Sequence, residues 1–155
     1  MEERLVIRFA QSSDVKTILE LIKELAEYEK LSDRVIATEE KLERSIFGNE
    51  KFVEILLAEV NNKSVGYALF FKNYSTFLGK PGIYLEDLFV KPSYRGKGIG
   101  KALLSKIISI AKERNYGRVE WSVLDWNLSA IDFYKKMGAE PLEEWKVFRL
   151  TSDKF

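Results

Sequence analysis

The sequence contains no cysteine and no histidine in its 155 residues. The lack of cysteine excludes disulfide bonds and thiolate nucleophiles, and the lack of both residues excludes zinc sites built from them. Without an imidazole, catalysis of the Ser-His type is also excluded. Any proton transfer must therefore use carboxylates, tyrosine, lysine, water or the backbone.

Neither charge nor hydropathy indicates a nucleic-acid or membrane partner. The 25 Lys and Arg residues nearly balance the 24 Asp and Glu residues, so no strong field attracts polyanions. No apolar run has the length of a membrane span, and residues 1–7 carry acids where a signal peptide has bases. We therefore expect a cytoplasmic protein, folded as a single domain over residues 1–155.

Hydrophobic periodicity predicts an α/β fold in the order βααβββαβαβ. A cap at Ser12-Ser13-Asp14 and a hairpin turn at Asn61-Asn62 support these boundaries. Strands are expected at residues 5–9, 52–60, 63–72, 83–90, 119–124 and 145–150, and helices at 12–30, 38–48, 98–114 and 127–137. The order predicts antiparallel strands first and a β-α-β crossover later.

The strand at 83–90 changes its apolar phase in the middle. Ile83 and Leu85 share one parity, whereas Leu88 and Val90 share the other, so the alternation slips by one residue at Glu86-Asp87. A β-bulge produces such a slip, and bulges re-aim side chains beside active sites. The alternative is a pair of solvated charges at a kink in the strand.

Residues 94–101 have the sequence YRGKGIGK and lie between a predicted strand and a predicted helix. Glycines there leave backbone N–H groups uncovered, and the following helix adds its positive N-terminal end. Together these features suit a pyrophosphate. The alternative is a glycine-rich turn without a ligand.

Two common phosphate-binding motifs do not match this loop. A P-loop would need glycine where Arg95 stands and Ser or Thr where Ala102 stands. A dinucleotide-binding fingerprint would need glycine at Lys101 or at Leu103. The pattern that does match is Arg-X-X-Gly-X-Gly.

This pattern resembles the acetyl-CoA pyrophosphate loop of the GNAT acetyltransferase superfamily. Over residues 5–150 the chain is similar to the spermidine/spermine (diamine) acetyltransferase family within it. The matching stretches are LIKELAEYE at 21–29, YLED at 84–87, YRGKGIG at 94–100, WN at 126–127 and FYK at 133–135. The stretches EKLSD at 29–33 and VLDWN at 123–127 are more similar to the thialysine-acetylating branch. The resemblance implies the GNAT fold, a mixed and mostly antiparallel twisted sheet flanked by helices.

The resemblance also implies roles for individual residues. Glu86 becomes the candidate base, acting through water or as a substrate anchor, and Tyr134 the candidate acid. The implied cofactor-binding residues are Leu88, Phe89, Val90, Arg95, Gly96, Lys97, Gly98, Ile99, Gly100, Lys101, Asn127, Ser129 and Tyr134. The implied substrate-binding residues are Tyr28, Glu29, Glu86, Asp87, Glu120, Trp121 and Ser122. Tyr134 could instead be a core aromatic, and Asn127 only a helix cap.

The leading hypothesis is an acetyl-CoA-dependent N-acetyltransferase without a metal. It would act directly on the primary amine of a polyamine, a diamine or a thialysine-like amino acid, since no cysteine can hold the acetyl group. The alternatives are acetylation of protein lysines or N-terminal amines, and a non-catalytic acyl-CoA-binding module. By resemblance a homodimer is expected.

Overall fold

The computed structural model describes residues 3–155, which form two compact units. The first unit extends to Ser122 and the second comprises Val123–Phe155. Among the described residues, no helix combines the length and the apolarity that crossing a bilayer requires.

An open five-stranded sheet forms the first unit, with its strands side by side in chain order. The four strands from β1 to β4 are antiparallel to their neighbours, and β5 pairs parallel to β4. The strands are β1 (Leu5–Phe9), β2 (Glu54–Val60), β3 (Lys63–Ser75), β4 (Lys80–Val90) and β5 (Val119–Trp121). This arrangement confirms the predicted mixed, mostly antiparallel sheet.

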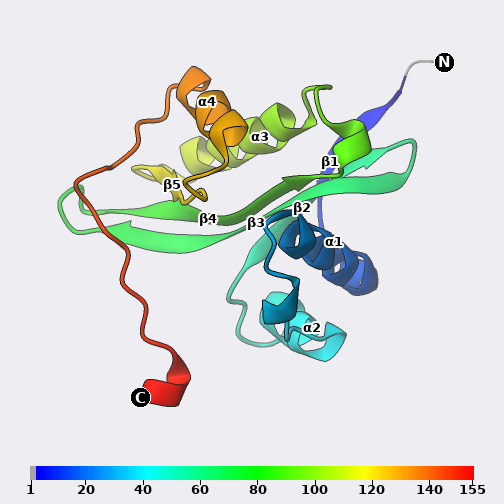
Figure 1. Cartoon of the computed structure of the whole chain (residues 1–155), viewed down its shortest axis with the longest axis horizontal. Coiled ribbons are helices and arrows are strands. Elements are labelled where there is room, and N and C mark those ends of the chain that lie inside the picture. The colour runs from blue at the N-terminus through cyan, green and yellow to red at the C-terminus, as the bar shows by residue number, and fades with distance from the viewer. Residues whose placement is uncertain (1–2) are drawn as a thin grey trace. The chain divides into compact units, whose positions relative to one another are not determined.

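Helices cover both faces of this sheet. Figure 1 shows α1 (Val15–Tyr28) and α2 (Glu39–Phe47) on one side and α3 (Ile99–Glu113) on the other. Short 3-10 helices, η1 (Ser12–Asp14), η2 (Ser32–Arg34) and η3 (Pro92–Tyr94), occupy the connections.

The two faces of the sheet carry separate apolar layers because side chains alternate along a strand. On the α1 side, Ile18 and Leu21 pack with Leu57 and Tyr67 in one buried cluster. The predicted apolar face of α3 is buried at Ile99, Leu103, Ile107 and Ile110.

The hairpin turn between β2 and β3 has the predicted form, whereas the start of α1 differs in its hydrogen bonds from a standard cap. Asn61 and Asn62 both have positive φ, 50° and 67°, as the predicted two-residue turn requires. At α1, however, Ser12–Asp14 forms η1, and the Asp14 carboxylate accepts hydrogen bonds from Arg8 and from the Gln11 amide. Asp14 thus occupies the N-cap position of α1, within the predicted cap, but its carboxylate binds Arg8 on β1 instead of a helix N–H.

The second unit contains α4 (Leu128–Lys136) and the 3-10 helix η4 (Ser152–Lys154). Oδ1 of Asn127 accepts a hydrogen bond from the Ala130 amide at 3.4 Å, which confirms the predicted cap. Gly138, with φ 94°, follows the helix, where a left-handed residue is common.

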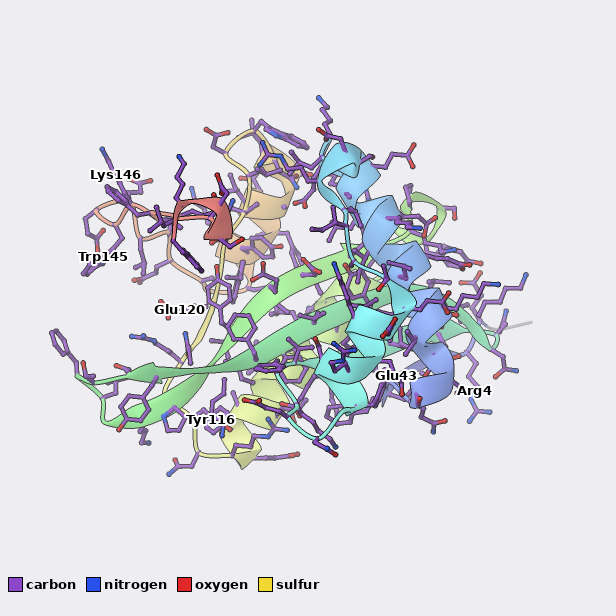
Figure 2. The ribbon with its side chains drawn as sticks, turned by 90° about the horizontal axis from the view of Figure 1, so that it is seen from below. Arg4, Glu43, Tyr116, Glu120, Trp145 and Lys146 are labelled. Atoms are coloured by element: carbon purple, nitrogen blue, oxygen red, sulfur yellow. The ribbon has the colours of Figure 1, made fainter. Side chains whose placement is uncertain are left out.

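The strand predicted at residues 145–150 is wrong, since this segment is irregular. Its apolar residues are exposed, Trp145 by 73% and Phe148 by 92%, and Figure 2 shows Trp145 and Lys146 extending from a segment without regular structure. An apolar alternation forms a strand only where a neighbour accepts its backbone hydrogen bonds. The described residues of this unit provide no such neighbour. The strand predicted at 119–124 also ends early, at Trp121.

Candidate functional site

A β-bulge in β4 places two adjacent acidic residues on one face of the sheet. Asp87 pairs with Leu69, but Leu85 pairs with the next residue of β3, Phe70, so Glu86 is the extra residue. The bulge predicted at Glu86-Asp87 is therefore confirmed. Because the extra residue reverses the side-chain phase, Leu85 is buried in one layer while Asp87 and Phe89 face the α1 side.

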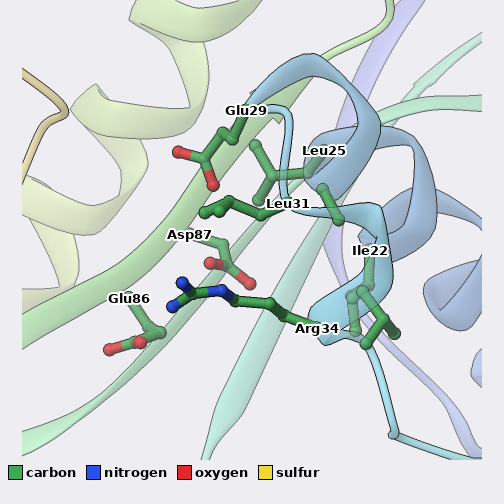
Figure 3. A pocket seen from close by; sticks show the side chains of 9 residues that line it. Ile22, Leu25, Glu29, Leu31, Arg34, Glu86 and Asp87 are labelled. Atoms are coloured by element: carbon green, nitrogen blue, oxygen red, sulfur yellow. The ribbon is translucent and has the colours of Figure 1, made fainter.

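A cavity of about 340 Å³ lies on this face, between β4 and the C-terminal end of α1. Figure 3 shows Glu29, Glu86 and Asp87 from these two elements around it. Arg34 of η2 lies in the same cavity and points toward Glu86 and Asp87. The apolar lining residues are Ile22, Leu25, Ala26, Leu31 and Val35. Three predicted substrate-binding residues are thus brought together in one cavity.

Tyr67 of β3 supports Asp87 from beneath the cavity. The Tyr67 side chain is fully buried, and its hydroxyl donates a hydrogen bond to Asp87 Oδ2 at 2.9 Å. Sequence analysis missed this residue. A tyrosine among the apolar residues of a buried strand was the available signal, because a buried hydroxyl requires an acceptor.

Burial and mutual repulsion raise the pKa values of the acidic groups at this site. Burial raises the pKa of Asp87 to about 6; the Tyr67 hydrogen bond opposes the rise, and Glu86 and Glu29 add to it. The pKa of Glu29 is raised by burial and by Glu86. The pKa of Tyr67 is raised well above its usual value by burial and by Asp87. A cation in the cavity would relieve this repulsion and favour the ionised carboxylates.

The glycine-rich loop lies, as predicted, between a strand and the start of a helix. Gly96 and Gly98 have φ values of 75° and 82°, a region that other residues rarely adopt. A Cβ at either glycine would meet no atom within 4 Å, so the space over both is open. Gly98 is the N-cap of α3, whose first turn includes Ile99, Gly100 and Lys101. The N–H groups at this helix end lack intrahelical acceptors and suit an anion.

Arg95 of this loop turns back toward the sheet. Its Nε donates a hydrogen bond to the Val90 carbonyl at 2.9 Å, and its guanidinium lies 4.3 Å from the centroid of the Tyr28 ring. The same group lies 5.6 Å from the centroid of the Phe89 ring. The predicted substrate residue Tyr28 therefore contacts a predicted cofactor residue. Nζ of Lys97, in the same loop, lies 3.2 Å from a carboxylate oxygen of Glu3.

The second edge of β4 is open along the segment that contains Leu88, Phe89 and Val90. β5 pairs with β4 only from Ile83 to Leu85, whereas β3 continues to Val90. Among the described residues, no strand pairs with this edge beyond Leu85. Its backbone groups can therefore hydrogen-bond to an extended ligand that carries amides.

The predicted substrate residues of β5 do not belong to the cavity. The Glu120 carboxylate pairs with Arg118 Nε at 2.9 Å and accepts a hydrogen bond from Asn73 at 3.4 Å; Figure 2 labels Glu120. Trp121 pairs with Leu85 in the sheet, and Ser122 Oγ lies 2.8 Å from the Tyr84 hydroxyl. Of the substrate-binding set, three residues thus line the cavity, three lie in β5 or directly after it, and Tyr28 lies against Arg95 of the glycine-rich loop.

Tyr134, Asn127 and Ser129 belong to the second unit. Tyr134 is half-buried on α4, with its ring centroid 5.5 Å from that of Phe133. Ser129 Oγ donates a hydrogen bond to Asn127 Oδ1 at 3.3 Å. Asn127 therefore caps α4, and its contact with the cofactor stays a prediction.

Comparison with known proteins identifies relatives over nearly the whole chain. The family model of the Acetyltransferase (GNAT) family matches residues 15–139. The thialysine N-epsilon-acetyltransferase of Bos taurus is 43% identical over 96% of this chain and 93% of its own length. The human spermidine/spermine N(1)-acetyltransferase-like protein 1 is 35% identical over 95% of this chain, but over only 22% of its own length.

A solved structure supports the same fold. An integron cassette protein from the mobile metagenome of V. cholerae superposes with a TM-score of 0.81 at 27% identity. The match covers 97% of this chain and 94% of that protein.

The raised pKa of Asp87 predicts a specific dependence of stability on pH. Its folded-state pKa of about 6 exceeds the ordinary value of 3.8, so ionisation destabilises the fold as the pH rises between these values. Asp87→Asn keeps an acceptor for Tyr67 and removes this penalty. Relative to the parent, the variant should gain on the order of 2–3 kcal/mol between about pH 4 and about pH 7.5, measured by urea unfolding.

Asp14→Asn is the control with the opposite sign. Hydrogen bonding to Arg8 lowers the pKa of Asp14, so this variant should lose stability at neutral pH and lose less as the pH falls through that pKa. An Asp87→Asn difference from the parent that is the same at both pH values would show that the folded-state pKa of Asp87 is not raised.

Proposed function

Because the chain belongs to the GNAT acetyltransferase family, we propose that it transfers an acetyl group from acetyl-CoA directly to the primary amine of a small aliphatic amine. The observation that carries this proposal is the cavity in which the bulge of β4 places Glu86 and Asp87 opposite Glu29. A volume of about 340 Å³ suits a polyamine, a diamine or a thialysine-like amino acid. The amine acetyltransferases among the relatives support the same class of reaction.

The residues of the first unit fit acetyl-CoA. The open space over Gly96 and Gly98 and the first turn of α3 suit its pyrophosphate, with Arg95, Lys97 and Lys101 as nearby cations. The unpaired edge of β4 at Leu88, Phe89 and Val90 suits the amides of its pantetheine arm. Acetyl-CoA supplies the activated acetyl thioester, and a backbone N–H near Leu88 donates a hydrogen bond to the acetyl oxygen.

Glu86 has two roles in this proposal. An alkylammonium ion with a pKa of about 10.4 cannot attack until it loses a proton. Glu86 takes that proton, through an ordered water, and its charge also holds the cation. Asp87 and Glu29 add negative charge around the same amine, and Tyr28 binds it beside Glu29.

Tyr134 acts as the general acid. A phenol retains its proton at neutral pH and can donate it to the departing sulfur. Asn127 and Ser129, at the N-terminal end of α4, bind acetyl-CoA. The sequence match at FYK carries this assignment.

The resemblance to the family and the composition of the chain support four further features: direct transfer, a second stretch of the amine site, a single domain and a homodimer. Transfer is direct because the chain has no cysteine to carry an acetyl group. Glu120, Trp121 and Ser122 contribute a second stretch of the amine site. The two units act as one domain, and the protein is a cytoplasmic homodimer.

Release of CoA from acetyl-CoA, measured with a panel of amines, tests the function. We expect turnover with diamines, polyamines or lysine analogues, and little with peptides that contain lysine or a free N-terminus. Turnover confined to peptides would instead establish a peptide acetyltransferase. Tight binding of acetyl-CoA without turnover of any amine would establish a non-catalytic acyl-CoA-binding module.

Gly98→Ala tests the pyrophosphate loop. At a φ of 82° alanine is strained, so the loop and the start of α3 must shift. We expect the KM for acetyl-CoA to rise about tenfold, since loss of about 1.4 kcal/mol of binding has that effect. Gly79→Ala is the matched control: Gly79 has a φ of 64° and similarly open surroundings, but it lies in the β3–β4 turn. Equal effects of the two variants on this KM would contradict the loop assignment.

Glu86→Gln tests the carboxylate. Without the base, turnover should depend on amine that is already neutral, so kcat/KM should fall about 100-fold at neutral pH and rise steadily toward pH 10. The pH–rate profile and the KM for the amine are the measurements. Glu113→Gln, at an exposed position at the end of α3, is the control. A variant profile that overlays the parent would remove Glu86 from both roles.

Tyr134→Phe tests the acid. We expect kcat to fall by about 100-fold or more, with little change in the KM for the amine. Tyr74→Phe, which alters an exposed tyrosine of β3, should have no effect. Unchanged turnover under conditions where chemistry limits the rate would exclude the phenol as proton donor.

A further inference from the structure

Arg34 places a cation in a cavity whose other charged groups are carboxylates. It belongs to η2, which follows α1, and its side chain lines the cavity together with Glu29, Glu86 and Asp87. Figure 3 shows the guanidinium directed toward Glu86 and Asp87. Yet none of the ion pairs within 4.0 Å among the described residues includes Arg34.

This arrangement is unfavourable for an acceptor that carries only positive charge. A diamine that approaches the carboxylates also meets the guanidinium, and like charges at close range repel. An arginine that served only to neutralise Asp87 or Glu86 would form a close ion pair with one of them, as Arg8 does with Asp14 at 2.8 Å. The cavity thus holds carboxylates together with a guanidinium that forms no close ion pair with them.

The backbone around Arg34 is ordered by local hydrogen bonds. The Arg34 amide donates to the Leu31 carbonyl at 3.0 Å, and the Val35 amide donates to the Ser32 carbonyl at 3.4 Å. Leu31 and Val35 themselves line the cavity. The guanidinium is therefore presented from a turn whose apolar residues form part of the same wall.

We propose that Arg34 binds the carboxylate of an amino-acid acceptor whose distal amine lies at the Glu29, Glu86 and Asp87 carboxylates. This inference rests on the proposed acetyltransferase function and narrows its acceptor to a molecule with both charges. The planar guanidinium suits a carboxylate because it can donate two parallel hydrogen bonds to it. Arg34 is then a specificity-determining residue, which distinguishes an amino acid from the corresponding diamine.

L-Lysine and cadaverine form a matched pair that tests this role, because they differ only in the carboxylate. Arg34→Gln should raise the KM for lysine about tenfold or more, since a charge-assisted hydrogen bond to the carboxylate is lost. The same variant should lower the KM for cadaverine by roughly two- to threefold, because a repelling cation is removed. Arg34→Lys should restore part of the preference for lysine. Arg44→Gln, at an exposed position of α2, should leave both KM values at the parent level.

Binding measurements separate this inference from the proposed function. Calorimetric titration of lysine and cadaverine into the parent and into Arg34→Gln compares their affinities without any turnover. A loss of affinity confined to lysine supports the role of Arg34 even where no acetylation is detected. Equal changes for both ligands, or no change for either, in KM and in affinity would overturn it, even if the enzyme acetylates both amines.

Discussion

The side-chain phase of β4 depends on one extra residue, Glu86. Leu85, which precedes the bulge, is buried on one face of the sheet. Phe89, which follows the bulge, is buried on the other face in the cluster with α1. Both burials cannot be satisfied by a regular strand, because residues four apart would face the same layer. The bulge satisfies both, and the charged pair Glu86-Asp87 is thereby held beside the end of α1. The apolar core thus positions the polar site.

The position of Asp87 has an energetic cost that its neighbours partly offset. The Asp87 carboxylate lies near those of Glu86 and Glu29 and is poorly solvated. The Tyr67 hydroxyl donates a hydrogen bond to it. Tyr67 is itself inaccessible to water, so the pair is arranged by the packing of β3 and β4. The ionised carboxylates therefore lower the stability of the fold, as charged groups that are concentrated in a poorly solvated place do.

The sequence predicted those features that depend on neighbouring residues along the chain. The phase slip at Glu86, the turn at Asn61-Asn62 and the glycine-rich loop before α3 are local, so they could be found from residue order alone. The buried strand could signal that the Tyr67 hydroxyl needs an acceptor, but it could not identify Asp87 as that acceptor, because the hydrogen bond joins two strands. The position of Arg34 in the cavity could not be predicted either, because it depends on where the turn after α1 lies relative to β4. At residues 145–150 a strand was predicted that the structure does not contain. The apolar alternation is present, but a strand also needs a hydrogen-bonding partner, and local sequence does not show whether one is available.

The order of the strands has a consequence for the way the chain folds. Every strand of the sheet pairs with the strand that precedes it in the sequence, so each partner is already available when the next strand emerges during synthesis. The pairing of β2 with β3 and of β3 with β4 requires only short loop closures. The pairing of β1 with β2 must wait for α1 and α2, and the pairing of β5 with β4 must wait for the fifteen residues of α3. The bulged strand β4 can therefore pair with β3 before β5 is synthesised. The edge of β4 that later faces β5 is open in the nascent chain as soon as β4 has paired with β3.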